Sequence, residues 1–210
     1  MLVPEPIHQD LKDGQKSKKY SKTIRLWHWA NALVITGSLI TVLINSTLFE
    51  DESVRALPQG RSIFHTLEDK VWGIHIYFGY ALAALFVFRI VLELFQPPGQ
   101  KFMGKMKLAY RDYFVVRKKM ALAKHELIVK IVYLIFYMLL AIMVLTGVTL
   151  SFEDQLPIPG NIIHSVKDFH GFCMYLIITF IVVHIAGVFL AERKDSKGIV
   201  SNMINGGKDA

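Results

Sequence analysis

Four long apolar runs set the strongest limit on what this chain can fold into. They cover residues 24–48, 71–95, 127–150 and 169–191, and each holds 23–25 residues. A helix needs about 20 apolar residues to cross the hydrocarbon core of a bilayer. Hydrophobic residues make up 53% of the chain, which exceeds the share in a typical soluble domain. We therefore expect an all-α fold, an integral membrane four-helix bundle in which residues 24–191 form one domain.

Charge is distributed unevenly among the segments that flank the apolar runs. The two tails, residues 1–23 and 192–210, and the loop 96–126 are rich in lysine and arginine. Residues 49–70 carry five acidic and three basic side chains, and residues 151–168 carry three and one. Because basic segments stay on the cytoplasmic side, we expect a multi-pass protein of the bacterial inner membrane with both termini in the cytoplasm. We attribute the charge of the basic loop to topology and anionic lipid, and expect no nucleic-acid partner.

Four of the eight histidines lie within the apolar runs, where an ionisable side chain is costly unless something binds it. His170 and His184 are 14 residues apart in the sequence. A helix places such residues on nearly one face, about 21 Å apart along its axis. From the direction of each span, His28 and His184 lie at the cytoplasmic level, and His75 and His170 at the outer level. Two imidazoles at one depth on facing helices suit an iron porphyrin, which takes them as axial ligands.

Other interpretations of these histidines stay open at this point. A single histidine in a span commonly forms a hydrogen bond between helices. Zinc is an alternative to haem iron as the metal that these histidines bind, but it needs about four donor atoms converging within a few Å. The separation of the two histidine levels does not provide such a cluster.

Two arginines are candidates for the same sites. Arg25 lies one turn before His28, and Arg89 lies deep in the second apolar run at the cytoplasmic level. Each is a candidate contact for a haem propionate, because arginine binds carboxylates through charge-assisted hydrogen bonds. The alternatives are snorkelling to the membrane surface for Arg25 and an i,i+4 ion pair with Glu93 for Arg89.

Three stretches resemble one family of membrane cytochromes. They are RLWHWANALVITG (residues 25–37), HIYFGYALAALFVFRIVLELF (residues 75–95) and FHGFCMYLIITFIVVHIAGVFLAERKDSKGIVSNMINGGK (residues 169–208). They are similar to the first, second and fourth helices of the prokaryotic cytochrome b561 and nickel–iron hydrogenase b-type cytochrome family. That family includes the gamma subunits of membrane formate dehydrogenases. The resemblance covers about residues 20–207.

The resemblance implies two non-covalent haem b groups and assigns their axial ligands. His28 and His184 would bind the inner haem, and His75 and His170 the outer haem, which is the pairing that depth alone suggests. It also implies a role as the quinone-reactive, electron-transfer subunit of an oxidoreductase. Such a subunit relays electrons between a periplasmic redox partner and the quinone pool. The partner is either a hydrogenase- or dehydrogenase-like subunit or a cytochrome c.

The resemblance also implies a quinone near the inner haem, around Asn31, Arg89, His184 and the start of the 96–126 loop. The alternative is that these residues serve only packing and topology. Acidic residues outside the membrane form a candidate docking patch for the redox partner: Glu50, Asp51, Glu52, Glu68, Asp69, Glu153 and Asp154. The alternative is that these side chains are only solvated. A homo-oligomer is a further option that the sequence leaves open.

Two rival functions remain. The first is a stand-alone oxidoreductase of the same fold, which passes electrons from a small molecule such as superoxide to quinone. The second is a haem-free transporter in which the histidines of the spans relay protons. Haem content distinguishes the haem-free transporter from the two electron-transfer functions. Co-purification of a redox subunit distinguishes the electron relay from the stand-alone oxidoreductase.

Overall fold

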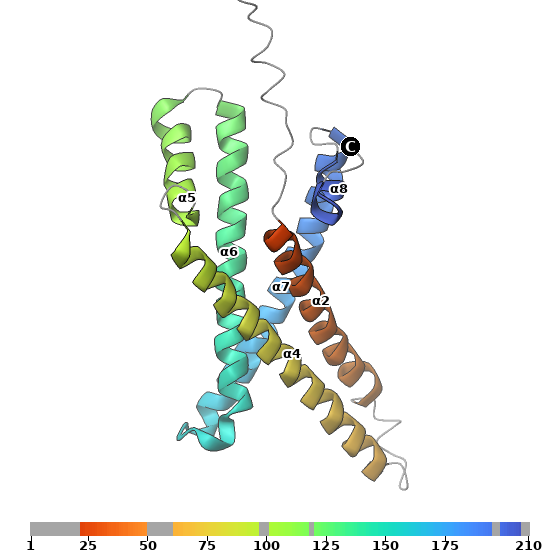
Figure 1. The fold of residues 1–210 in the computed structure, drawn as a ribbon. Coiled ribbons are helices and arrows are strands. Elements are labelled where there is room, and N and C mark those ends of the chain that lie inside the picture. Colours follow the sequence, from red (N-terminus) through yellow and green to blue (C-terminus); the bar gives the residue numbers. More distant parts are fainter. Residues whose placement is uncertain (1–21, 50–60, 97–100, 118–119, 195–197, 207–210) are drawn as a thin grey trace, which may run out of the picture. The chain divides into compact units, whose positions relative to one another are not determined.

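The computed structural model describes residues 22–49, 61–96, 101–117, 120–194 and 198–206 (Figure 1). All regular elements among these residues are helices, and no strand occurs in the part of the chain that is described. This confirms the expected all-α fold.

Four long helices carry the apolar runs. They are α2 (Lys22–Ile44), α4 (Arg61–Phe95), α6 (Met120–Ser151) and α7 (Gly160–Lys194). Within the described residues, these four are long and apolar enough to cross a membrane. Many of their large apolar side chains are exposed; Leu33, Leu145 and Val182 are more than 60% exposed. Apolar side chains that point away from the other helices are favourable in lipid, so the integral membrane fold is confirmed.

Three of the long helices begin well before the predicted apolar runs, and α6 begins at Met120 rather than near residue 127. α4 begins at Arg61 rather than near residue 71, and α7 begins at Gly160 rather than near residue 169. Gly160 follows Pro159, and proline is compatible with a helix start but not with a helix interior. Hydropathy locates the part of a helix that lies in lipid, whereas the helix itself continues through polar residues to the next breaker.

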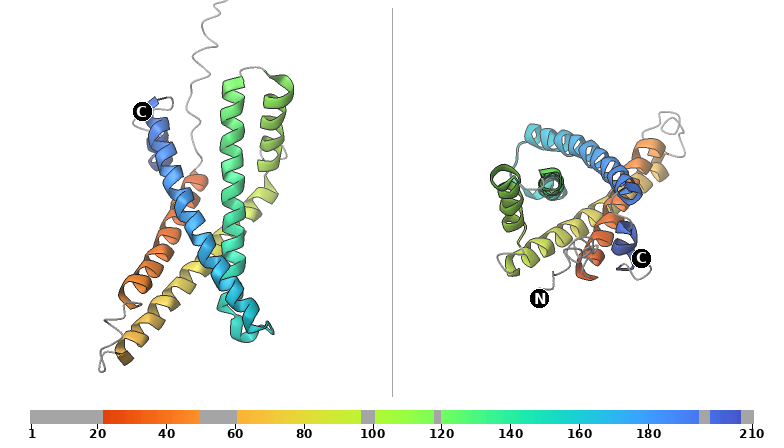
Figure 2. Two further views of the ribbon diagram at one scale, coloured as in Figure 1. Left: turned by 180° about the vertical axis from the view of Figure 1, so that it is seen from behind. Right: turned by 90° about the horizontal axis from the view of Figure 1, so that it is seen from above.

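The basic loop between the second and third spans contains helices that the sequence did not predict. These are α5 (Phe102–Arg111) and the π-helix η2 (Asp112–Val116), after which Arg117 adopts a left-handed conformation with φ of 52°. Figures 1 and 2 show α5 alongside the first half of α6. Ala109 of α5 is 2% exposed, so α5 packs against protein at this residue, whereas Lys105 and Lys107 are exposed.

The chain divides into two compact units. The first unit contains residues 1–29 and 181–210, and its described part is the start of α2, the end of α7 and α8 (Ile199–Ile204). The second unit contains residues 30–180. It holds the rest of α2 with the π-helix η1 (Asn45–Phe49), together with α4, α5, α6, the 3₁₀ helix η3 (Glu153–Gln155) and the first part of α7.

Small and aromatic side chains bring the helices of the second unit together. A Cβ at Gly37 would lie 2.5 Å from the ring of Phe78, so the missing side chain lets α2 approach α4 closely. The rings of Phe136 and Phe180 stack with centroids 4.7 Å apart and join α6 to α7. Cys173 is 1% exposed, which agrees with packing rather than reactivity.

Candidate functional site

The second unit contains the predicted outer histidine pair. His75 comes from α4 and His170 from α7, and their ring centroids lie 6.4 Å apart with an interplanar angle of 85°. Both residues are partly buried. The structure therefore brings together two residues that are 95 positions apart in the sequence and that were paired by their expected depth and by the family resemblance.

Hydroxyl groups of α2 indicate which ring nitrogen of His75 carries the proton. Its Nδ1 atom lies 3.1 Å from Thr41 Oγ1, 3.2 Å from Ser38 Oγ and 3.3 Å from the Ser38 carbonyl oxygen. Thr41 donates its own hydroxyl proton to the Ser38 carbonyl at 2.6 Å. The threonine oxygen is then left to accept the Nδ1–H of His75. This assignment of the tautomer leaves the Nε2 lone pair available to a metal.

The same arrangement occurs at His170 with residues of α6. Nδ1 of His170 lies 2.7 Å from Thr146 Oγ1, and Thr146 donates its proton to the Ile142 carbonyl at 2.7 Å. Thr146 is thus an acceptor for Nδ1–H. A Cβ at Gly147 would lie 3.3 Å from Cε1 of His170, so this glycine lets the ring lie against α6. Ligand histidines are usually oriented by such a hydrogen bond from the second ring nitrogen.

The first unit contains the predicted inner pair. His28 comes from α2 and His184 from α7, with ring centroids 6.2 Å apart and an interplanar angle of 51°. The indole of Trp29 lies edge-on to His28 at 5.4 Å. Nδ1 of His28 is buried and has no hydrogen-bond partner among the described residues. A buried polar atom without a partner is unfavourable, so a purely structural hydrogen-bonding role does not account for His28.

The donor sets fit an iron porphyrin. With a metal–imidazole bond of about 2 Å, and each ring nitrogen about 1 Å from its ring centre, two axial imidazoles have centroids roughly 6 Å apart. Both pairs have this spacing. Among the described residues, no three His, Cys, Asp or Glu side chains converge on a point that could hold a bare metal ion. A porphyrin brings its own four nitrogens and needs only two axial ligands, whereas zinc would need more donors than either pair supplies.

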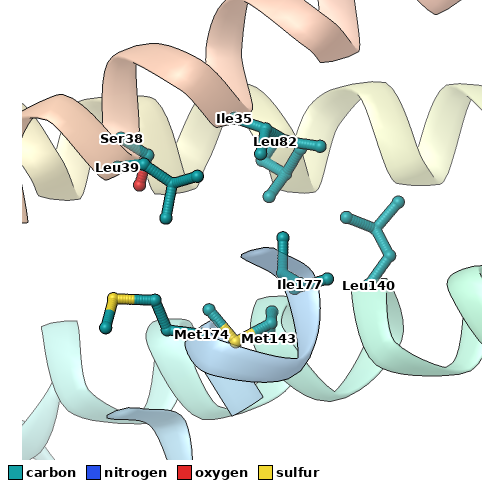
Figure 3. A pocket seen from close by; sticks show the side chains of 8 residues that line it. All are labelled: Ile35, Ser38, Leu39, Leu82, Leu140, Met143, Met174 and Ile177. Atoms are coloured by element: carbon teal, nitrogen blue, oxygen red, sulfur yellow. The ribbon is translucent and has the colours of Figure 1, made fainter. Parts of the chain in front are cut away.

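Figure 3 shows an apolar pocket in the second unit, which is lined in part by Ser38, a hydrogen-bonding neighbour of His75. Its lining consists of Ser38 and seven apolar side chains, which are Ile35, Leu39, Leu82, Leu140, Met143, Met174 and Ile177. Leu82 follows His75 by seven residues, and Met174 and Ile177 follow His170 by four and seven, so these side chains share the faces of the two histidines. The pocket would thus offer a bound porphyrin an apolar surface.

Arg89 is held by two side chains of the second unit. Its Nη1 atom lies 3.1 Å from Glu93 Oε2, and its Nε donates to the hydroxyl of Tyr137 at 3.1 Å. Glu93 also accepts the backbone N–H of Phe102, which leads into α5. The ion pair with Glu93 is the alternative considered for Arg89, and a propionate contact stays a prediction for it.

Two of the remaining histidines, His65 and His164, form no pair of this kind among the described residues. His65 is exposed and lies 3.6 Å from Glu68, and His164 is exposed near the start of α7. His8 lies outside the described residues, as do three members of the acidic patch, Glu50, Asp51 and Glu52. The other four members of the patch are described, and Asp69, Glu153 and Asp154 among them are exposed.

Sequence reasoning missed the residues that orient the outer histidines. Ser38, Thr41 and Thr146 are hydroxyl side chains within apolar runs, and such residues in spans commonly hydrogen-bond to another helix. Asn31 and Asn45 lie seven residues on either side of Ser38, and both are less than 5% exposed. Polar residues at this seven-residue spacing predict that one face of α2 packs against protein rather than lipid.

Four apolar helices and two partly buried imidazole pairs among the described residues define the class of the protein as a helical membrane protein suited to bis-histidine ligation. The family profile described as prokaryotic cytochrome b561 matches residues 19–206, and the chain belongs to this family. It is therefore a multi-pass membrane b-type cytochrome that transfers electrons, and its cofactor is haem b. Comparison with curated proteins and with solved structures finds no significant match.

Proposed function

We propose that the protein holds two haem b groups and relays electrons between a periplasmic redox partner and the quinone pool of the bacterial inner membrane. The observation that carries this proposal is the pair of bis-imidazole sites. His28 faces His184, and His75 faces His170, each at the ring spacing that one iron between them requires. Bound haem would supply the one-electron chemistry.

The chain's own residues would prepare the outer site for this role. Thr41 and Thr146 hold Nδ1–H of the two histidines and so direct Nε2 towards the iron. The apolar lining beside the pair, with its two methionines, excludes water and adapts to the macrocycle. A low dielectric around a haem is one of the factors by which a protein sets the redox potential of the haem.

The topology follows from charge. Basic side chains are concentrated in residues 1–23, 96–126 and 192–210, which supports a cytoplasmic position for both tails and for the loop. The inner haem would then lie on the cytoplasmic side, with quinone near it and protons taken from the cytoplasm. The acidic side chains of residues 49–70 and 151–168 would face the periplasmic partner, which is a hydrogenase- or dehydrogenase-like subunit or a cytochrome c.

Haem content is the decisive measurement. The protein purified in mild detergent should show a b-type reduced-minus-oxidised spectrum and two haems per chain. His28→Ala and His75→Ala should each lose one haem, because each removes one ligand from a different pair. His65→Ala is the matched control and should retain both haems, since His65 is exposed and paired with Glu68.

Other outcomes discriminate between the rival functions. A colourless protein from haem-replete cells would refute the di-haem proposal and favour a proton-relay role for the histidines. A di-haem protein that purifies without a second redox subunit, and that reduces quinone with superoxide as donor, would support the stand-alone oxidoreductase instead of the relay.

A further inference from the structure

The described C-terminal segment, residues 198–206, is tied to the end of α7. The carboxylate of Glu192 accepts the backbone N–H of Gly198 at 2.7 Å and that of Val200 at 3.1 Å. Gly198 has a φ of 85°, a conformation that favours glycine. The start of the segment therefore lies beside the end of α7, and the carboxylate satisfies N–H groups that the first turn of α8 leaves unpaired.

The other end of the segment is tied to the start of α2. The Met203 carbonyl accepts a hydrogen bond from Trp29 Nε1 at 3.1 Å, and the Ile204 carbonyl accepts one from Arg25 Nη1 at 3.2 Å. Carbonyl groups at a helix C-terminus lack partners within the helix and carry partial negative charge. The end of α8 is therefore suited to hold a guanidinium group.

Gly206 lies against the same guanidinium. Its φ is 82°, and a Cβ there would lie 3.0 Å from Nη1 and 3.2 Å from Cζ of Arg25. Any larger residue is strained by its backbone and pushes against Arg25. Asn202, in the middle of α8, is 3% exposed. The segment is thus attached to the rest of the first unit at several points rather than at one.

The two side chains that the segment holds both neighbour His28. Arg25 precedes His28 by three residues and so lies on its face of α2, and the Trp29 ring contacts the imidazole. Nε of Arg25 is buried and has no hydrogen-bond partner among the described residues. A guanidinium has five N–H donors, so donors remain for an anionic group in addition to the Ile204 carbonyl.

We propose that residues 198–206 are a positioning part of the inner haem site, which orients Arg25 so that its guanidinium meets a haem propionate. This inference rests on the proposed haem ligation by His28 and His184. It assigns the C-terminal segment a role in setting the inner haem potential. A cation beside the haem favours the reduced iron, which carries one positive charge less, so displacing Arg25 should lower the midpoint potential of the inner haem.

Gly206→Ala is the most direct test, because it acts on Arg25 without removing any hydrogen-bonding group. A potentiometric titration of the purified di-haem protein would resolve the two haems, and the component missing in His184→Ala identifies the inner one. The inner component of Gly206→Ala should shift to lower potential while the outer component stays in place. Trp29→Phe, which removes the donor to Met203 but keeps an aromatic ring, should shift the inner component in the same direction.

Gly160→Ala provides the matched control, since a Cβ at Gly160 would meet no atom within 4 Å. Both of its components should keep the wild-type potentials. Unchanged potentials in haem-loaded Gly206→Ala and Trp29→Phe would overturn the inference while leaving the di-haem proposal intact. Equal shifts of both components would also overturn it, because they would indicate a general disturbance. Absence of haem from the wild-type protein would instead refute the proposed function itself.

Discussion

Replacing Thr146 with valine isolates the hydrogen bond that orients His170. Valine keeps the branched shape of threonine but removes the oxygen that lies 2.7 Å from Nδ1. Leaving a buried donor without an acceptor costs about 1–3 kcal/mol. Since about 1.4 kcal/mol corresponds to a tenfold change in an equilibrium constant, we expect haem affinity at the outer site to fall roughly 10- to 100-fold. Loss of a second hydrogen-bonding partner at a metal-ligating histidine typically has an effect of this size.

The structure also predicts how His75 should differ from His170. Thr41→Val removes one acceptor from Nδ1 of His75, but the hydroxyl and the carbonyl of Ser38 remain within 3.3 Å. The effect of Thr41→Val on haem affinity should therefore be smaller than that of Thr146→Val. Thr149→Val is the control on the same helix, because the Thr149 hydroxyl donates to the Leu145 carbonyl instead.

The rate of haem transfer to an excess of a competing apoglobin measures these differences. Thr146→Val should lose its outer haem fastest, Thr41→Val more slowly, and Thr149→Val at the wild-type rate. The outer haem of Thr146→Val should also move to higher potential, because an imidazole without its hydrogen bond is a weaker donor to ferric iron. Equal rates for Thr146→Val and Thr149→Val would refute the orientation argument, and a larger effect of Thr41→Val would refute the redundancy at His75.

Two further predictions concern stability, measured by thermal unfolding in detergent. Gly37→Ala should destabilise the protein by about 1–3 kcal/mol, because the new Cβ meets the Phe78 ring at a distance that forces the helices apart; a variant as stable as wild type would show that α2 and α4 are not in close contact. Asn45→Leu should stabilise the protein by about 1–3 kcal/mol, because the amide of Asn45 is 2% exposed and has no hydrogen-bond partner among the described residues. Destabilisation by Asn45→Leu would show that the amide has a partner, such as bound water.

The sequence predicted the number and identity of the long helices because lipid imposes a length and a composition on any span. It placed the starts of the second and fourth spans later in the chain than the helices begin, since residues 61–70 and 160–168 are more polar than the apolar runs that follow them. It also missed α5, because the lysines of residues 101–107 were attributed to topology. The same basic residues can set the orientation of a membrane protein and also belong to an amphipathic helix.

The histidine pairs were predictable because depth in a membrane follows directly from position along a span. Which hydroxyl groups contact the rings was not predictable in the same way. The contact of Thr146 with His170 depends on the rotation of α6 relative to α7, and an amphipathic pattern does not fix that rotation when most of each helix faces lipid. The contacts of Arg25 with the C-terminal segment join residues 179 positions apart in the sequence, and no apolar pattern in the short α8 indicates this contact.

The two proposed haem sites are supported by different chemistry, and this difference predicts a direction for the proposed electron path. At the outer site, neutral hydroxyl oxygens accept Nδ1–H of both ligands, which strengthens the imidazoles as donors and favours ferric iron. At the inner site, Nδ1 of His28 has no such acceptor among the described residues, and the cation of Arg25 lies one turn away. Both effects lower the outer potential relative to the inner one. Electrons should therefore pass favourably from the periplasmic side to the cytoplasmic side, and the same potentiometric titration checks the order; a more positive outer haem would show that other parts of the sites dominate their potentials.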